Sequence, residues 1–171
     1  MPVTLIVKST DAAEERLRTA TAQRALDCLG NELPDRRLLC FLDDEEWQTF
    51  KDSNGDALDG RNSQVYVLIF PASKIPPAER FWSITAYTPD TIELIRNPLK
   101  KYAVASYTPG LVTNQDGSIS IYMSREQPSG VPQANWLPVA NRPFNIMLRC
   151  YGSTGTVAAG TYVPPAVERI Q

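Results

Sequence analysis

The residue type that most limits the chemistry of this chain is histidine, because none of the 171 residues is a histidine. Histidine is the usual general base near neutral pH and a common metal ligand. Its absence excludes the Ser-His-Asp triad, cysteine activation by histidine, the HExxH metal site and the facial iron triad. A catalyst in this chain would have to use carboxylates, tyrosine, lysine, arginine or an unusual thiol.

Paired carboxylates are one chemistry that remains accessible without histidine. The adjacent acids of residues 43–46 would point in different directions on a helix, so we interpret them as a solvated acidic face. A glycosidase instead brings together two carboxylates that are distant in sequence. Those available for such a pair are Asp90, Glu93, Asp116 and Glu126. The alternative function is therefore a carboxylate-based, glycan-active hydrolase or lyase that works without histidine.

An oxygen-rich turn is the weak candidate for a metal site. Its members are Asp52, Asn54, Asp56 and Asp59. Calcium favours several carboxylate and carbonyl oxygens from a tight turn, but here the EF-hand register fails. Ala57 stands at the sixth position instead of glycine, and Ser63 at the twelfth instead of glutamate. We therefore expect a solvated turn, with no metal and no cofactor.

Other enzyme and nucleic-acid signatures are missing. Cys28, Cys40 and Cys150 form no CxxC pair, which favours buried, reduced thiols. Neither GxxxxGK[ST] nor GxGxxG occurs, so nucleotide binding by those loops is not supported. The formal net charge is −2, whereas a nucleic-acid binder usually carries a basic surplus. No nucleic-acid partner is expected.

Aromatic, arginine and asparagine side chains in strands and loops are the candidates for ligand binding. The candidates are Arg149, Tyr151, Trp136, Trp82 and Asn135. Flat aromatic faces with polar neighbours suit sugars, and a guanidinium binds carboxylate or phosphate bidentately. Two alternatives stay open. The tryptophans could pack the core and a crossing loop with their N–H groups bonded to backbone, and Arg149 could pair with an acid on a neighbouring strand.

The first 50 residues carry mostly helical patterns. Val3 to Val7 is predicted to be a short strand. Asp11 and Glu14 form a capping-box-like pair for a helix from about Ala12 to Leu29. A second helical piece is predicted from Asp35 to Phe50.

Strands dominate from Lys51 onward. The predicted strands are Val65–Phe70, Phe81–Tyr87, Tyr102–Tyr107, Ile119–Met123, Phe144–Tyr151 and Thr156–Val163. Pro89–Asn97 is predicted as a helical turn and Asn114–Gly117 as a hairpin turn. About six such strands, with helices confined to the first third, indicate a β-sandwich or barrel. The expected division is residues 1–50 as a strand and helical element, and residues 51–171 as the β-rich domain.

Alternation is cleanest in the strand Phe144–Tyr151. The residues expected to face inward are Phe144, Ile146, Leu148 and Cys150. Those expected to face the other way are Asn145, Met147, Arg149 and Tyr151. Successive side chains of a strand point to opposite faces, so the two sets should lie on opposite sides of the sheet.

A series of short motifs resembles an uncharacterised bacterial family, domain of unknown function 1214. The motifs are Phe81-Trp82-Ser83-Ile84-Thr85-Ala86-Tyr87, Asn97-Pro98, Asp116-Gly117-Ser118, Asn135-Trp136-Leu137-Pro138, Pro143-Phe144, Leu148-Arg149-Cys150-Tyr151 and Pro164-Pro165. The match covers about Lys51 to Arg169. The resemblance implies a mainly β fold, a jelly-roll-like antiparallel β-sandwich preceded by a small N-terminal helical element. The family has no agreed activity, so no residue inherits a role from it.

The cellular compartment expected for this chain follows from the absence of membrane-span and leader signals in the sequence and from the family resemblance. No apolar run is long enough for a membrane span or a secretory leader, so the chain as written is expected to be cytoplasmic. Members of the similar family often follow a second β-domain, domain of unknown function 1254, in chains that look exported. If this sequence is a piece of such a chain, we expect a periplasmic protein.

Three hypotheses for function follow. The first is a non-catalytic β-sandwich module that binds a glycan or another envelope-type ligand, or mediates assembly with another protein domain. The second is the carboxylate-based enzyme described above, which requires two convergent carboxylates in one pocket. The third is a purely structural part of a larger assembly.

Overall fold

The computed structural model of the protein describes residues 45–170. The strand predicted at Val3–Val7 and the helix predicted at Ala12–Leu29 lie outside this part of the chain. The described residues form eight strands in two four-stranded sheets, with very little helix. The fold is therefore mainly β, as the sequence predicts.

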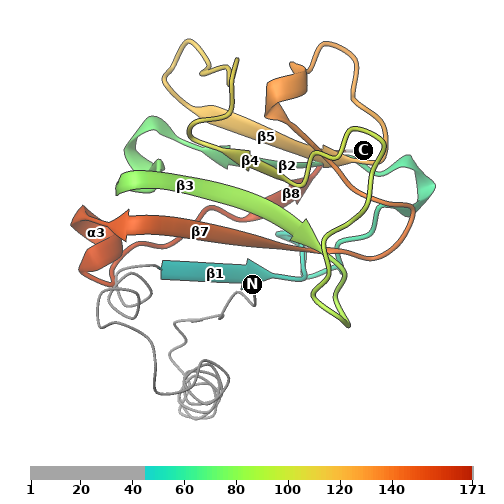
Figure 1. The fold of residues 1–171 in the computed structure, drawn as a ribbon, viewed down its shortest axis with the longest axis horizontal. Coiled ribbons are helices and arrows are strands. Elements are labelled where there is room, and N and C mark those ends of the chain that lie inside the picture. The colour runs from blue at the N-terminus through green and yellow to red at the C-terminus, as the bar shows by residue number, and fades with distance from the viewer. Residues whose placement is uncertain (1–44, 171) are drawn as a thin grey trace, which may run out of the picture.

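The first sheet has the strand order β1-β7-β3-β4. Its strands are β1 (Glu45–Thr49), β7 (Asn145–Ser153), β3 (Ala78–Tyr87) and β4 (Ala103–Ala105). The second sheet has the order β6-β5-β2-β8. Its strands are β6 (Trp136–Pro138), β5 (Ile119–Ser124), β2 (Tyr66–Phe70) and β8 (Val167–Arg169). Figure 1 shows β3, β7 and β1 side by side in one layer, with β5, β2 and β8 in the other.

Four short helical pieces lie in the connections. They are η2 (Arg61–Ser63), η3 (Ala72–Lys74), η4 (Gln133–Asn135) and α3 (Gly155–Ala158). None is long enough to cover a sheet. Within residues 45–170, the structure has no helix with the length and apolar character needed to cross a bilayer.

One hydrophobic core lies between the two sheets. Strand β7 contributes Ile146, Leu148 and Cys150, which confirms the inward face predicted for that strand. Strand β2 contributes residues of the same period, namely Tyr66 and Leu68. Because side chains alternate along a strand, each strand supplies every second residue to this core. The side chains on the opposite face of β7, including Asn145, Met147 and Arg149, are also buried. Strand β7 is therefore enclosed on both faces.

The helix predicted from Asp35 to Phe50 is wrong at its C-terminal end, because Glu45–Thr49 is strand β1. All five of its residues pair with β7, from Glu45 opposite Cys150 to Thr49 opposite Ile146. Backbone pairing with a strand about a hundred residues away overrides the local helical preference of the acidic residues. Strand β1 therefore lies ahead of the expected boundary at Lys51.

The end of the chain also differs from the prediction. The strand expected at Thr156–Val163 is absent, and α3 occupies Gly155–Ala158 instead. Gly160 has a φ of +68°, a conformation that ends the helical turn. The last strand, β8, begins only at Val167, after the prolines at 164 and 165 that cannot donate to a ladder.

Two loop predictions are corrected. Pro89–Asn97 contains turns and an isolated bridge between Tyr87 and Leu94, with no helix. Asn114–Gly117 does turn, with the Gly117 N–H donating to the Asn114 carbonyl at 2.9 Å. It joins no hairpin, because the strand that follows, β5, pairs with β2 and β6.

The sheets are not wholly antiparallel, which corrects the expectation of an antiparallel sandwich. Strand β6 runs parallel to β5, with Trp136 opposite Tyr122 and Pro138 opposite Ser124. The chain between these strands, residues 125–135, carries it back to the same end of the sheet. A parallel pair requires such a crossing connection, and here it is irregular and rich in proline.

Candidate ligand-binding cleft

The residues predicted from the sequence as a ligand patch do not lie together. Arg149 and Tyr151 belong to β7 and Trp82 to β3, all in the first sheet. Asn135 and Trp136 lie at the start of β6, in the second sheet. The five residues therefore divide between two sheets that pack on opposite sides of the core.

Arg149 is enclosed and paired on the outer side of the first sheet. Its Nε donates to Glu46 Oε1 on β1, and its Nη1 donates to the Tyr87 hydroxyl at 2.6 Å. Its guanidinium carbon lies 5.3 Å from the centre of the Tyr87 ring, and only 5% of the residue is exposed. Burial alone would lower the pKa of Arg149, but the Glu46 carboxylate and the Tyr87 hydroxyl raise it above its usual value.

Trp82 and Tyr151 both have aromatic partners. Trp82 lies in the core, with its ring centre 5.3 Å from that of Phe70. Tyr151 stacks on Phe81 with ring centres 4.2 Å apart, and Phe81 also meets the exposed Tyr107 edge to face at 5.0 Å. Phe81 therefore joins Tyr107 and Tyr151 in one aromatic cluster on the first sheet.

Trp136 lines a cleft of about 580 Å³ on the second sheet, which we call the Trp136 cleft. Its apolar residues include Trp136, Pro138 and Val139 from β6 and the residue after it. The loop residues that complete it are Arg96, Asn97, Pro98, Leu99, Arg125, Glu126, Gln127, Gln133, Ala140 and Asn141. An apolar floor with convergent polar groups is the usual composition of a small-molecule site.

The indole of Trp136 is held rigidly. Its Nε1 donates to the Ser124 carbonyl at 3.2 Å and lies 3.1 Å from Ser124 Oγ. Only 7% of Trp136 is exposed, so the ring offers a ligand little of its surface. A ligand in this cleft would be recognised mainly by the surrounding loop side chains.

Asn135 fixes one wall of the Trp136 cleft through its side-chain amide. Its Oδ1 accepts from the Val112 N–H, and its Nδ2 donates to the carbonyls of Val112 and Ser120, all at 2.9 Å. Since all of these bonds go to backbone, Asn135 is a positioning residue and not a group available to a ligand.

Lys101 fixes the chain just before Asn135. Its Nζ donates to the Gln133 carbonyl and to the Ala134 carbonyl at 3.1 Å. Partial burial lowers the pKa of Lys101. This lysine ties the loop after β3 to η4, two segments that both contribute to the cleft.

Gly60 allows the wall of the cleft that contains Val139 and Ala140 to pack closely against the backbone at position 60. The Gly60 N–H donates to the Arg142 carbonyl at 3.0 Å. A Cβ at Gly60 would lie 2.1 Å from the Ala140 carbonyl oxygen and 3.1 Å from Val139 Cγ2. Only glycine fits here, although its φ of −80° is open to any residue.

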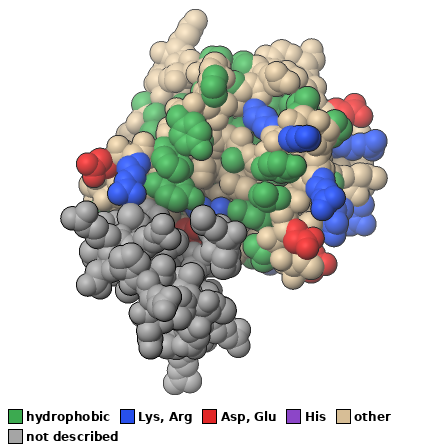
Figure 2. All heavy atoms as spheres, in the orientation of Figure 1, with side chains coloured by type: hydrophobic (Ala, Val, Ile, Leu, Met, Phe, Trp, Pro, Cys, Tyr) green, Lys and Arg blue, Asp and Glu red, His purple; other side chains and the backbone are tan. Residues whose placement is uncertain are grey.

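The charge of the Trp136 cleft is predominantly positive. Its charged lining residues within the described chain are Arg96, Arg125 and Glu126, two cations and one carboxylate. Figure 2 shows Lys and Arg side chains gathered on the side of the molecule where β3 ends, beside hydrophobic side chains. Sequence reasoning missed Arg96 and Arg125, because each is isolated in a loop and no local pattern marks it.

The oxygen-rich turn directs its carboxylates to separate partners. Asp52 Oδ1 accepts the backbone N–H groups of Asn54 at 2.9 Å and Asp56 at 3.1 Å. Asp56 Oδ2 accepts from Arg169 Nη2 at 2.9 Å. Within residues 45–170, no three acidic or cysteine side chains are grouped as metal ligands.

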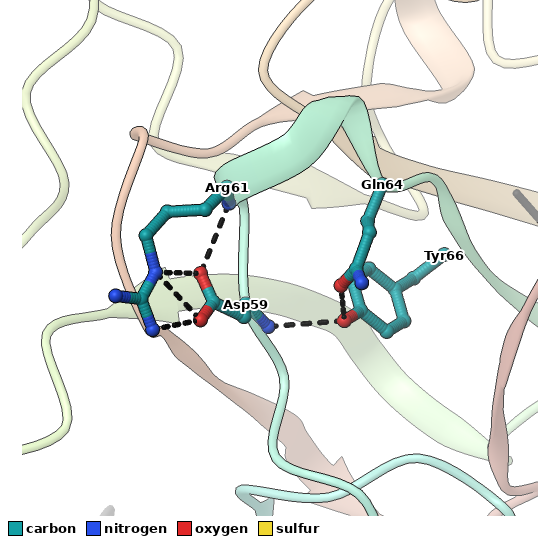
Figure 3. Close-up of polar contacts among 4 residues, drawn as sticks. All are labelled: Asp59, Arg61, Gln64 and Tyr66. Atoms are coloured by element: carbon teal, nitrogen blue, oxygen red, sulfur yellow. Dashed lines mark hydrogen bonds and ion pairs between the residues drawn. The ribbon is translucent and has the colours of Figure 1, made fainter.

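Asp59 is held by Arg61, as Figure 3 shows. The Arg61 Nε donates to Asp59 Oδ1 at 3.0 Å and Oδ2 at 2.8 Å, and this hydrogen bonding lowers the pKa of the Asp59 carboxyl. The Asp59 N–H donates to the Tyr66 hydroxyl at 3.1 Å, which donates in turn to Gln64 Oε1 at 2.6 Å. Asp59 therefore links the turn to the core strand β2.

The carboxylates considered for a catalytic pair are dispersed. Of Asp90, Glu93, Asp116 and Glu126, Glu126 alone lines the Trp136 cleft. Asp90 lies 4.0 Å from Arg142, and Asp116 accepts from the Ser118 hydroxyl at 2.6 Å. The described residues thus place one carboxylate, and not a pair, at this cleft.

The geometry described so far defines a mainly β domain with a positively charged cleft and no assembled catalytic pair in that cleft. The chain belongs to the family described as protein of unknown function (DUF1214), whose model matches residues 45–155. The comparison with curated proteins found no match.

Two solved structures are similar to the chain. The VPA0106 protein from Vibrio parahaemolyticus has a TM-score of 0.66 and 23% identity, covering 96% of this chain and 47% of that one. An uncharacterized protein from Burkholderia cenocepacia has a TM-score of 0.47 and 15% identity, covering 81% of this chain and 33% of that one. The chain thus spans about half the length of the Vibrio protein, and the likeness concerns the fold alone.

Proposed function

We propose that this domain is a non-catalytic, jelly-roll-type β-sandwich module that binds an acidic glycan in the Trp136 cleft. The observation that carries the proposal is the pair of exposed arginines, Arg96 and Arg125, lining a cleft whose floor contains Trp136. Guanidinium groups bind carboxylates bidentately, and an uronic-acid sugar supplies such carboxylates. Amide side chains at Gln127 and Gln133 add hydrogen-bonding groups for sugar hydroxyls.

The positioning groups support a preformed site. Asn135 and Lys101 fix the η4 segment through backbone carbonyls, so the cleft wall does not have to be ordered by the ligand. Preorganisation lowers the entropic cost of binding. The volume of about 580 Å³ falls within the range of small-molecule sites, which is about 300–1,000 Å³.

The alternative, a carboxylate-based hydrolase or lyase, receives less support. Both retaining and inverting glycosidases need two carboxyl groups flanking the scissile bond. Glu126 is the one carboxylate among the described residues of the cleft. A binding role needs no second carboxylate, so the cleft fits it better.

The experiment is a calorimetric titration of the full chain with tetragalacturonate and, as the neutral counterpart, cellotetraose. We expect the acidic sugar to bind more tightly, and the double variant Arg96→Ala/Arg125→Ala to lose about tenfold or more in affinity, the equivalent of ~1.4 kcal/mol. Arg80→Ala is the matched control, because Arg80 is exposed on the other sheet.

Three results would decide the matter. Equal binding of both sugars, or no effect of the double variant, would overturn the acidic-glycan proposal. Shortening of either sugar during incubation, followed by chromatography, would favour the enzymatic alternative.

A further inference from the structure

A second cavity, of about 470 Å³, lies between the two sheets at the edge formed by β1 and β8. We call it the inter-sheet cavity. Its lining residues are Trp47, Gln48, Thr49, Lys51, Asp52, Ser53, Gly55, Leu68, Ile84, Ile146, Leu148, Pro164, Pro165, Ala166 and Val167. It shares no lining residue with the Trp136 cleft.

The deep part of the inter-sheet cavity is apolar. Leu68, Ile84 and Leu148 come from three different strands and are each at most 3% exposed. Ile146 and Val167 are equally enclosed. Transfer of a hydrocarbon chain from water to an apolar surface of this kind is favourable.

The outer part of the inter-sheet cavity is built by rigid groups. Trp47 meets Tyr162 edge to face, with ring centres 5.2 Å apart. The prolines at 164 and 165 form part of the wall, and the Ser53 N–H donates to the Val167 carbonyl at 2.7 Å, which fixes the turn to β8. These contacts fix the outer wall of the inter-sheet cavity.

Two buried polar atoms on residues that line the inter-sheet cavity, Gln48 Nε2 and Asp52 Oδ2, have no hydrogen-bond partner among residues 45–170. The Asp52 side chain is 0% exposed, and its Oδ2 accepts no hydrogen bond from the part of the chain that the structure describes. Arg169 Nε lies 3.8 Å away, close enough to balance the charge but too far for a hydrogen bond. A buried carboxylate oxygen without a donor is unfavourable, and a ligand hydroxyl would satisfy it.

We propose that the inter-sheet cavity binds a neutral single-chain amphiphile, with its hydrocarbon chain between the sheets and its hydroxyl donating to Asp52 Oδ2. The apolar floor selects the chain. The acceptor selects a head that carries an O–H donor, which an ionised carboxylate lacks. Arg169 beside Asp52 and Lys51 among the lining residues disfavour a cationic head.

The test measures the binding of 1-octanol, 1-methoxyoctane and octanoate to the full chain by calorimetry. We expect 1-octanol to bind at least tenfold more tightly than the other two. Affinity should also rise about fourfold for each methylene added from hexanol upward until the cavity is filled.

Two variants separate the head contact from the cavity itself. In Asp52→Asn, Oδ1 can still accept the turn N–H groups, but an amide replaces the orphan acceptor, so the preference for octanol over its methyl ether should disappear. Ala166→Trp, at the exposed rim, should weaken all three ligands, and Ala159→Trp, exposed outside the cavity, should weaken none.

The proposal is overturned if 1-octanol fails to bind, if octanoate binds as well as octanol, or if the preference survives in Asp52→Asn. Thermal unfolding of each variant distinguishes a lost site from a lost fold. Because the two cavities share no residue, failure here leaves the acidic-glycan proposal untouched.

Discussion

Arginines occur in two contrasting environments in this domain. On the first sheet, Arg149 is enclosed, bonded to Glu46 and Tyr87, and closed to any ligand. At the Trp136 cleft, Arg96 and Arg125 lie in loops and are exposed. The strand position of Arg149 makes it the more conspicuous in the sequence. The comparison teaches that an arginine facing away from a core is a binding candidate only where its neighbours leave it unpaired.

The largest effect expected from this comparison is on stability at Arg149. Arg149→Ala leaves Glu46 enclosed without its arginine, which should lower the free energy of unfolding by about 3–5 kcal/mol. Urea unfolding followed by far-UV circular dichroism measures the change. Arg80→Ala, an exposed arginine on the same sheet, is the control, with an expected change within about 0.5 kcal/mol. A loss at Arg149 below 1 kcal/mol would contradict the structural role assigned to it.

The next largest effect is expected at Asn135. Asn135→Ala removes three hydrogen bonds to backbone, including the bond to the buried Ser120 carbonyl. We expect a loss of about 2–3 kcal/mol in the free energy of unfolding. Asn141→Ala, at the exposed rim of the same cleft, should be nearly neutral in urea unfolding. Equal losses at both positions would show that Asn135 does not position the wall.

A smaller effect on stability is expected in the Trp136 cleft. The double variant Arg96→Ala/Arg125→Ala should change the free energy of unfolding by no more than about 0.5 kcal/mol per site, because both side chains are exposed. Urea unfolding of this variant beside Arg149→Ala tests the contrast directly. A loss comparable to that of Arg149→Ala would remove the distinction between the two environments.

The smallest effect is expected from acid titration at Asp59. Its pKa is lowered by the hydrogen bonds from Arg61, so ionised Asp59 stabilises the fold above its unfolded pKa and that stability is lost as the pH falls through the folded pKa. The difference in stability between the native chain and Asp59→Asn should therefore shrink between about pH 5 and pH 2. Urea unfolding at four pH values measures it, and a difference independent of pH would refute the linkage.

Elements whose local pattern agrees with their long-range pairing could be predicted from the sequence. The period-two pattern around Ile146 and Leu148 describes a strand with one apolar face, and β7 has this arrangement. Glu45–Thr49 could not be predicted in this way, because its strand conformation depends on pairing with β7, far along the chain. The parallel β5–β6 pair likewise depends on the course of a loop.

The candidate sites were less predictable than the fold, since loops assemble them. Trp136 was singled out from its type and does line a cleft, but the arginines beside it come from two separate loops. The unpaired acceptor Asp52 Oδ2 could not be predicted from the sequence, because it depends on how β8 and the turn enclose the Asp52 side chain. Residue type suggests which groups can bind, and the enclosure of each group decides which of them are available.

Gly60 closely approaches Ala140, so one wall of the Trp136 cleft depends on a residue that does not line the cleft. Val139 and Ala140 line that cleft, and Gly60 lies behind them without lining it. A methyl group at position 60 would overlap the Ala140 carbonyl oxygen, 2.1 Å from the added Cβ, so the backbone of the wall would have to move. Substitution at position 60 is therefore expected to destabilise the domain and to displace this wall, although position 60 does not itself line the cleft.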